Sequence, residues 1–275
     1  MQSMPFALPL REQAARWFEE GRPAALVTVS AFKGSVPRET GTRMIVCADE
    51  VQGTIGGGHL EHIAIEEARA LLGAGDASDA PTHERHFPLG PALGQCCGGA
   101  VTLRFERLTK QALRDWPQVQ PRFHLQLYGA GHVGRAIVRL LEGIACKVEW
   151  IDEREEEFPR SPNAAHIQRV CVEPVEAEVR EAPPGALYLV LTHSHDLDMR
   201  ITEAILKRND FAYLGLIGSQ TKRARFIHRF EARGVNADAI ARMTCPIGVP
   251  GIEGKEPEVI AIAVVAQLLQ QAGAA

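Results

Sequence analysis

Three glycines and one acid form the pattern with the clearest chemical meaning in this chain. Gly129, Gly131 and Gly134 make a G-x-G-x-x-G directly after a run of β-prone residues, and Asp152 follows 23 residues after the first glycine. In a dinucleotide-binding unit such glycines admit a pyrophosphate to the start of the next helix, and the acid accepts hydrogen bonds from ribose hydroxyls. His132 lies inside the turn. The alternative is a turn that needs its glycines for packing alone and binds nothing.

Two adjacent cysteines are the second candidate for chemistry. Cys96 and Cys97 lie in the glycine-rich stretch LGQCCGG, where core packing gives no reason for them. A thiolate at such a turn can bind a soft metal or carry sulfur. The alternative is two inert small residues. Zinc and iron–sulfur sites are not indicated, because the chain has no C-x-x-C spacing.

A loop rich in small residues and cations precedes the cysteines by some fifty positions. In AFKGSVPRETGT the candidates are Gly34, Ser35, Arg38 and Gly41. Such a loop can place N–H groups and positive charge around an anion. An ordinary connection with solvated cations is the alternative.

Three consecutive glycines form the next candidate site. Gly56, Gly57 and Gly58 come directly before a helical pattern, and Glu61 lies in the first turn of that pattern. Runs of glycine indicate positive φ or a very close backbone approach, and the helix start can hold a phosphate. Glu61 either caps the helix or accepts hydrogen bonds from the N–H groups of a heterocycle.

The second half of the chain carries a histidine-rich turn. The apolar run 186–192 predicts a strand buried on both faces, which brings His193, His195 and Asp196 to the carboxyl edge of a parallel sheet. HSHDLD does not match the H-x-H-x-D-H order of metallo-hydrolases, so we expect ligand recognition there rather than a metal. Alternatively, Asp196 or Asp198 caps the helix that follows.

The next predicted strand, 213–217, ends in a turn that contains Gly218 and Ser219. A basic helix follows, with Lys222 one turn in. Together these three residues can meet an anion at the helix start.

Apolar periodicity and breakers predict the elements that position these residues. The first half reads as a helix over 11–20, strands over 24–29 and 43–47, a helix ending at Leu72, and strands over 82–87 and 100–105. In the second half, strands over 123–128, 146–151, 186–192 and 213–217 alternate with helices. The fold class is therefore α/β: an N-terminal α+β domain over 1–108, a linker over 109–122, and a Rossmann-like doubly wound parallel-sheet domain over 123–275.

Composition limits the classes of function. The 275 residues are 45% hydrophobic, and the formal net charge is -4, so nothing favours nucleic acid as a partner. The first residues do not resemble a secretory leader, and no stretch is long and apolar enough to cross a bilayer, so we expect a cytoplasmic protein. The six cysteines do not form a disulfide framework and are expected to be reduced.

Taken together, the motifs resemble the XdhC/CoxI family. Those that carry the resemblance are GSVPRETGTRM, GTIGGGHLE, LGQCCGG, LYGAGHVG, LTHSHDLD, LGLIGSQTKRARF and CPIGVPGIEGKEPEVIAIAVVAQLL, spread in order from about Ala25 to Leu269. The resemblance implies a cytoplasmic homodimer without turnover of its own, acting in purine catabolism. It would bind molybdenum cofactor, protect it while a cysteine desulfurase helps to add the sulfido ligand, and insert it into apo-xanthine dehydrogenase.

The family's functional positions carry over onto the glycine-rich loops, the cysteine pair and the Rossmann turn. All the residues named above as candidates are therefore expected to bind the cofactor, with Cys96 and Cys97 at molybdenum or its sulfur. Molybdopterin needs an anion site for its phosphate, polar groups for its pterin edge and soft surroundings for its metal, which these motifs supply.

Two other functions remain open from the residues. The Rossmann pattern favours an NAD(P)-dependent oxidoreductase, with Asp152 suited to NAD, Arg154 leaving NADP open, and His193 or His195 as the acid or base. A metal-dependent hydrolase is the third hypothesis and depends on HSHDLD alone.

Overall fold

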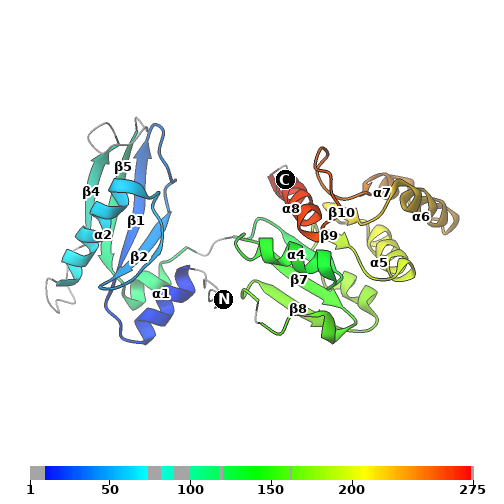
Figure 1. Ribbon diagram of the computed structural model, residues 1–275, viewed down its shortest axis with the longest axis horizontal. Coiled ribbons are helices and arrows are strands. Elements are labelled where there is room, and N and C mark those ends of the chain that lie inside the picture. Colours follow the sequence, from blue (N-terminus) through cyan, green and yellow to red (C-terminus); the bar gives the residue numbers. More distant parts are fainter. Residues whose placement is uncertain (1–9, 74–81, 90–98, 118–119, 162, 274–275) are drawn as a thin grey trace. The chain divides into compact units, whose positions relative to one another are not determined.

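The computed structural model describes residues 10–73, 82–89, 99–117, 120–161 and 163–273. The chain forms two compact units, Met1–Gln118 and Val119–Ala275, which are described separately (Figure 1). Among the described residues, no helix combines the length and apolar character needed to cross a membrane.

The first unit is built on an antiparallel sheet with helices on both faces. The strand order is β3-β2-β1-β5-β4. The strands are β1 (Ala24–Lys33), β2 (Arg43–Cys47), β3 (Val51–Gly53), β4 (His83–Pro88) and β5 (Ala100–Arg107). Helix α2 (Gly58–Gly73) packs on one face, and α1 (Leu10–Glu19) with α3 (Lys110–Arg114) packs on the other.

Burial on both faces explains why the first part of β1, Ala24–Val29, is apolar at every position except Thr28. Ala25, Val27 and Val29 face α2, whereas Ala24 and Leu26 face α1. All five are nearly inaccessible to solvent. A central strand that is covered on both faces favours apolar side chains on each, so β1 does not alternate between apolar and polar residues.

The segment 109–122, where we expected a linker, begins with α3. Thr109 caps this helix by accepting a hydrogen bond from the N–H of Ala112 at 3.1 Å. Ala112 and Trp116 then pack with Ala14 and Trp17 of α1. These contacts make the first part of the segment a layer of the first unit.

The second unit is a six-stranded parallel sheet of order β11-β10-β9-β6-β7-β8. The strands are β6 (His124–Tyr128), β7 (Lys147–Asp152), β8 (Ile167–Cys171), β9 (Leu187–Val190), β10 (Tyr213–Leu216) and β11 (Met243–Thr244). Counted along this unit, the order is 3-2-1-4-5-6, the doubly wound order of dinucleotide-binding folds. The expected fold class is confirmed.

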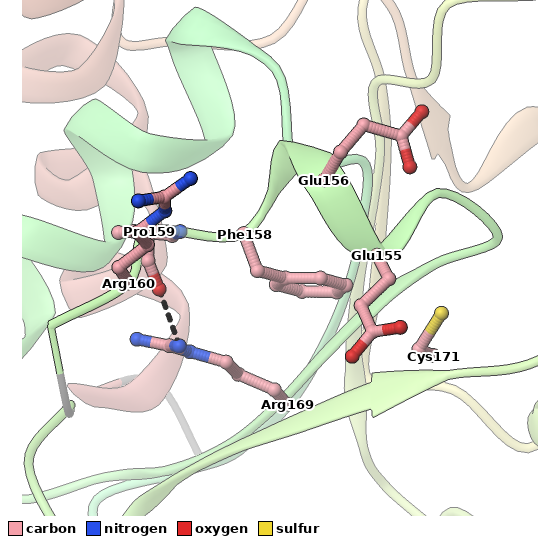
Figure 2. Close-up of a pocket in the computed structure, with 7 residues that line it drawn as sticks. All are labelled: Glu155, Glu156, Phe158, Pro159, Arg160, Arg169 and Cys171. Atoms are coloured by element: carbon pink, nitrogen blue, oxygen red, sulfur yellow. Dashed lines mark hydrogen bonds between the residues drawn. The ribbon is translucent and has the colours of Figure 1, made fainter.

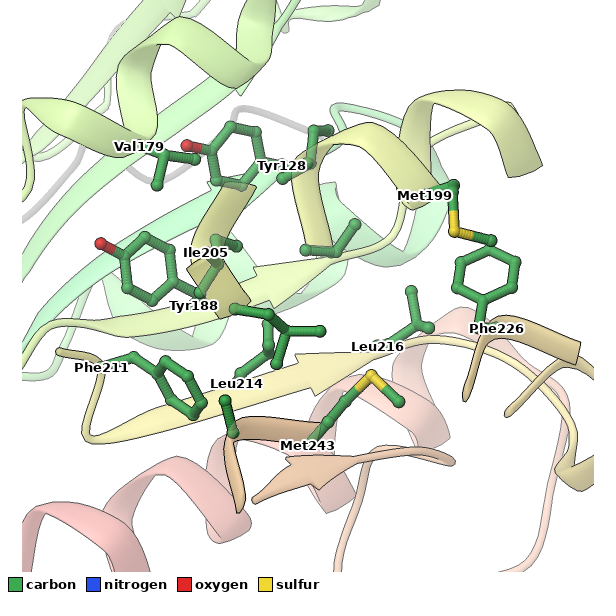
Figure 3. Close-up of a cluster of buried hydrophobic side chains, with 14 of the residues drawn as sticks. Tyr128, Val179, Tyr188, Met199, Ile205, Phe211, Leu214, Leu216, Phe226 and Met243 are labelled. Atoms are coloured by element: carbon green, nitrogen blue, oxygen red, sulfur yellow. The ribbon is translucent and has the colours of Figure 1, made fainter. Parts of the chain in front are cut away.

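Helices cover both faces of this sheet. Helices α4 (His132–Leu141) and α8 (Pro257–Gly273) pack on one face. The other face carries α5 (His195–Arg208), α6 (Gln220–Ala232), α7 (Ala237–Ala241) and the 3-10 helix η3 (Val175–Arg180). Figure 3 shows the second of these cores, in which Leu214 and Leu216 of β10 lie among aromatic and methionine side chains.

The sequence did not indicate the edge strands β3, β8 and β11 or the short helices α3 and α7. β8 has the sequence IQRVC and only one buried residue, Ile167. Its connection from β7 contains one short 3-10 helix, η2 (Glu155–Glu157), among its described residues. An edge strand needs few apolar residues, so its pattern is hard to distinguish from a loop.

Candidate functional site

Three glycine-rich segments of the first unit meet at one end of its sheet. A Cβ on Gly56 would lie 2.6 Å from Cγ of Pro37, so the triple-glycine turn presses against the loop between β1 and β2. A Cβ on Gly99, at the start of β5, would lie 2.4 Å from the main-chain oxygen of Ser35. Only glycine permits such approaches. We call these segments, residues 33–42, 54–58 and 99, the glycine cradle.

Glu61 occupies the donors of the triple-glycine turn. Its Oε2 accepts hydrogen bonds from Thr54 Oγ1 at 2.5 Å and from the N–H groups of Ile55 and Gly57, both at 3.0 Å. The N–H of Gly56 donates to Thr54 Oγ1 at 3.1 Å. This oxygen therefore has the capping role. The anion that binds to these N–H groups in the structure is the chain's own carboxylate rather than a phosphate.

The β1–β2 loop closes tightly but leaves its polar groups in solvent. Gly41 N–H donates to the main-chain oxygen of Val29 at 2.8 Å. Gly34, Ser35 and Arg38 are exposed. Within the described residues, neither Arg38 nor Lys33 forms an ion pair with an acid, although Glu39 follows Arg38 in the same exposed loop.

Cys96 and Cys97 lie outside the described residues. The described residues on either side of their segment, Leu89 and Gly99, are joined by a hydrogen bond of 2.7 Å from the N–H of Leu89 to the oxygen of Gly99. Gly99 also belongs to the cradle. The chain therefore enters and leaves the cysteine segment beside the β1–β2 loop.

In the second unit, each glycine of the G-x-G-x-x-G turn has its own environment. A Cβ on Gly129, where φ is 122°, would lie 2.4 Å from the oxygen of Leu191 just beyond β9. A Cβ on Gly134 would lie 2.1 Å from the oxygen of Gly129, so α4 packs directly on the turn. Gly131, at the start of α4, has nothing within 4 Å. This is the pattern of a dinucleotide turn, in which the middle glycine is left open to a ligand.

Asp152 is buried and fully engaged. Its Oδ2 accepts a hydrogen bond from the N–H of Ala130 at 2.7 Å, and both oxygens accept from the Arg154 guanidinium at 3.0 Å. The side chain is 4% exposed. Burial opposes ionisation, but the hydrogen bonds from Arg154 and Ala130 outweigh it and hold the carboxyl pKa below its usual value. A ribose would have to displace Arg154 to reach this carboxylate.

The histidine-rich turn lies at the carboxyl edge of the sheet, as expected, with its polar groups exposed. His193 approaches Glu153, which follows β7, at 3.7 Å. His195 and Asp196 are also exposed. The cap of α5 is Ser194, which accepts a hydrogen bond from the N–H of Leu197 at 3.4 Å. The alternative, capping of this helix by Asp196 or Asp198, is therefore wrong.

Asp198 and Lys222 form a buried ion pair that joins the first turns of α5 and α6. Lys222 Nζ donates to Asp198 Oδ2 at 2.5 Å and to the oxygen of Ile217 at 2.8 Å. Asp198 Oδ1 accepts from the N–H and hydroxyl of Thr192. The side chains of the pair are 1% and 10% exposed for Asp198 and Lys222, respectively. The ammonium is thus neutralised by Asp198, and no local pattern in the sequence pairs these two residues.

Gly218 and Ser219 arrange the start of α6 around that lysine. Ser219 caps the helix, accepting a hydrogen bond from the N–H of Lys222 at 3.2 Å. A Cβ on Gly218 would lie 2.5 Å from Cδ of Lys222. These residues come together as expected, but they hold Lys222 against Asp198.

A hollow of about 730 Å³ lies beside the edge strand β8 (Figure 2). It is lined by Glu155, Glu156, Phe158, Pro159, Arg160, Arg169 and Cys171. Arg169 donates to the oxygens of Pro159 and Asn163, at 2.5 and 2.6 Å. Burial and the nearby Glu155 raise the pKa of the Cys171 thiol. The thiolate form of Cys171 is therefore disfavoured.

Within the described ranges, no three or more His, Cys, Asp or Glu side chains come together as they would around a metal ion. The turn 193–198 separates its polar groups, because His193 turns toward Glu153 while Asp198 is buried against Lys222. Nothing in this geometry supports the hydrolase hypothesis.

Comparisons with known proteins agree in both units. A model of the XdhC Rossmann domain matches residues 125–268, and a model of the XdhC and CoxI family matches residues 17–83. The uncharacterized protein YqeB of Escherichia coli is 30% identical over 267 residues, which are 94% of this chain and 45% of that protein. The chain thus spans about half the length of this curated relative.

A solved structure described as a xanthine dehydrogenase from Bacillus halodurans has a similar fold. Its TM-score is 0.75, with 18% identity, and the match covers 97% of this chain and 96% of that one. At this identity the likeness concerns the fold alone.

Proposed function

The chain belongs to the XdhC and CoxI family, and from this premise we propose that it is an accessory protein of xanthine dehydrogenase. In this role it binds molybdenum cofactor, protects it while a cysteine desulfurase supplies the sulfido ligand, and inserts it into the apoenzyme. It acts in the cytoplasm as a homodimer and has no turnover of its own. The bound group would supply the dithiolene-held molybdenum that the client enzyme uses.

The glycine cradle is the observation that carries this proposal. Lys33 and Arg38 form no ion pair within the described residues, so they are available to the phosphate of a pterin cofactor. Leu89 and Gly99, the described residues on either side of the cysteine segment, are hydrogen-bonded to each other, and Gly99 belongs to the cradle. We propose that Cys96 and Cys97 serve the metal or its sulfur. A chain that offers both cations and thiols suits molybdopterin better than a simple anion, which needs no soft ligand.

The first test is the content of the purified protein. We expect near-stoichiometric molybdenum, with oxidised-pterin fluorescence, when the protein is purified without oxygen from a host that makes the cofactor. Incubation with apo-xanthine dehydrogenase should then restore xanthine oxidation while the carrier loses its metal. Absence of metal and pterin, even after incubation with free cofactor, would contradict the proposal.

The cysteine pair provides a sharper prediction. We expect the Cys96→Ala/Cys97→Ala variant to retain the cofactor at least about tenfold more weakly, because loss of metal-site partners has effects of this size. Molybdenum retained after gel filtration is the measurement. Cys171→Ala is the matched control, since Cys171 is an exposed thiol of the other unit. Equal retention by the double variant and the wild type would rule out a thiol role.

A nucleotide site at the Rossmann turn is a second candidate, favoured by the open space at Gly131. Because Arg154 occupies the oxygens of Asp152, we expect the wild type to bind NAD weakly. We expect Arg154→Gln to bind NAD about tenfold more tightly, because a hydrogen bond to a charged group contributes roughly 1.5–3 kcal/mol and the ribose no longer has to displace one. Calorimetric titration with NAD measures this. Arg160→Gln, an exposed arginine of the same connection, is the control.

A loss of NAD affinity in Arg154→Gln would have a different meaning from a gain. If Arg154→Gln weakens binding, the arginine itself contacts the nucleotide, as it would with a 2′-phosphate. If neither NAD nor NADP binds to any variant, the oxidoreductase hypothesis is excluded, and the proposal of a cofactor carrier is not affected.

A further inference from the structure

Helix α8 of the second unit has an outward face without charge. Residues 259–273 include no Asp, Glu, Lys or Arg. One side of the helix, with Val264 and Leu268, is buried in the core beneath it. The other side exposes Ile262 by 53% and Leu269 by 37%. A surface helix of a globular protein normally has a polar outward face, so α8 lacks the feature that contact with water favours.

The exposed side of α8 has the spacing of a seam between two packed helices. Its members lie three and four residues apart in turn, and all are exposed or partly exposed: Val259, Ile262, Ala266, Leu269 and Gly273. We call these residues the α8 stripe. A repeat of three and four keeps one line of apolar residues directed at a second helix. The α8 stripe therefore indicates that another helix packs along α8.

Charge decides which helix suits the α8 stripe. Every other described helix of eight or more residues has exposed charged side chains, for example Arg16 on α1, Glu66 on α2 and Arg139 on α4. A charge that loses its water against an apolar surface is unfavourable unless it gains a partner, and the stripe offers none. A second copy of α8 has no such charge. Among the described helices, the α8 stripe thus matches its own counterpart best.

The α8 stripe is also complementary to itself. Its smallest side chain with a Cβ, Ala266, lies at the centre, with Val259 and Gly273 seven positions to either side. An isologous interface places the same patch of two copies around a twofold axis. With that axis at Ala266, two antiparallel helices cross where the side chains are smallest. Ile262 then lies beside Leu269 of the partner subunit.

The area of the helix layer is compatible with such an interface. Helices α4 and α8, of 10 and 17 residues, pack side by side on one face of the sheet (Figure 1). At about 1.5 Å per residue and about 10 Å in width, they present on the order of 400 Å² in projection. Leu140 of α4, 40% exposed, adds apolar surface to this layer. Standard interfaces bury about 800 Å² of accessible surface per partner, so we expect a dimer that dissociates on dilution.

We propose that the α8 stripe is the surface through which two copies of this chain pair, with the two α8 helices antiparallel about Ala266. The inference rests on the proposed function, which includes a homodimer, and it names the surface that forms the dimer. No residue of the glycine cradle belongs to the α8 stripe. Substitutions in the stripe therefore change pairing without removing a residue that we assign to the cofactor.

The test is sedimentation velocity of the full chain over a range of concentrations. We expect the wild type to form dimers, and Ile262→Lys and Leu269→Glu each to weaken dimerisation at least about tenfold, because each places an unpaired charge in the interface. In Ile262→Lys/Leu269→Glu, the antiparallel arrangement brings each new ammonium beside a new carboxylate of the partner subunit. The double variant should therefore dimerise better than either single variant. A parallel arrangement would bring like charges together instead.

Phe18→Lys is the matched control, because Phe18 is a 39% exposed apolar side chain on α1, outside the α8 stripe. It should dimerise like the wild type, and far-ultraviolet circular dichroism should not distinguish the variants. A monomeric wild type, single variants that dimerise normally, or a double variant no better than the single variants would each overturn the inference.

Molybdenum content of the same wild-type preparation separates this inference from the proposed function. A monomer that retains the cofactor contradicts the interface alone. A dimer that dissociates in the single variants but contains no cofactor, even after incubation with it, supports the interface and contradicts the carrier function.

Discussion

Replacing Lys222 by methionine is expected to lower the free energy of unfolding of the second unit by about 3–5 kcal/mol. The substitution leaves the carboxylate of Asp198, whose side chain is 1% exposed, without its counter-ion, and unpaired buried charges have costs of this size. The change is measurable by urea denaturation in a Trp17→Phe/Trp116→Phe background. In that background Trp150, in the core of the second unit, is the only remaining tryptophan.

The companion variant tests the cause of this loss. In Asp198→Asn/Lys222→Met the side-chain oxygen can still accept the hydrogen bonds from Thr192, but no charge is buried. We expect the double variant to recover most of the lost stability. If the effects of the two single substitutions simply add, the pair is not coupled and the loss has another origin.

Replacing Glu61 by alanine is expected to lower the free energy of unfolding of the first unit by about 3 kcal/mol. The variant loses an acceptor of three hydrogen bonds, two of them from main-chain N–H groups of the triple-glycine turn. A hydrogen bond to a charged group contributes roughly 1.5–3 kcal/mol net, and because these donors are only part-buried, water replaces some of the lost bonds and the total stays below the sum of three. Amide hydrogen exchange at Ile55 and Gly57 should accelerate in the same variant.

The control for Glu61 is Glu66→Gln. Glu66 lies on the same helix, its side chain is 67% exposed, and its partner is His62 at 3.4 Å, so the control should change stability by less than about 0.5 kcal/mol. Because the turn forms one wall of the cradle, Glu61→Ala should also release molybdenum cofactor more easily. Slow exchange at Ile55 and Gly57 in Glu61→Ala would contradict the capping role.

Several parts of the site were predictable because they depend on neighbours in the sequence. The spacing of Gly129, Gly131 and Gly134 defines a turn between a strand and a helix wherever it occurs, since the constraint is local geometry. The cap by Glu61 joins residues only seven positions apart, and the apolar runs of β1 and β9 follow directly from burial on both faces.

Other features of the fold and the site depend on which segments, far apart in the sequence, come into contact. Asp198 and Lys222 are 24 residues apart, and no pattern in the sequence pairs them. A β-bulge at Ser30 of β1 is defined only by the register against β5, some seventy residues later. The edge strand β8 could not be recognised, because its polar residues suit an edge as well as they suit a loop.

The sequence by itself therefore determined the family, the doubly wound second unit and the positions of the glycine turns. These follow from local spacing and from hydrophobic period. Only the tertiary structure decided the roles of the charged and exposed apolar side chains: Asp152 is held by Arg154, Lys222 is neutralised by Asp198, and Ile262 stands exposed on α8. The reason is physical, because a side chain's role depends on its partners and its burial, and both are set by contacts between segments far apart in the chain.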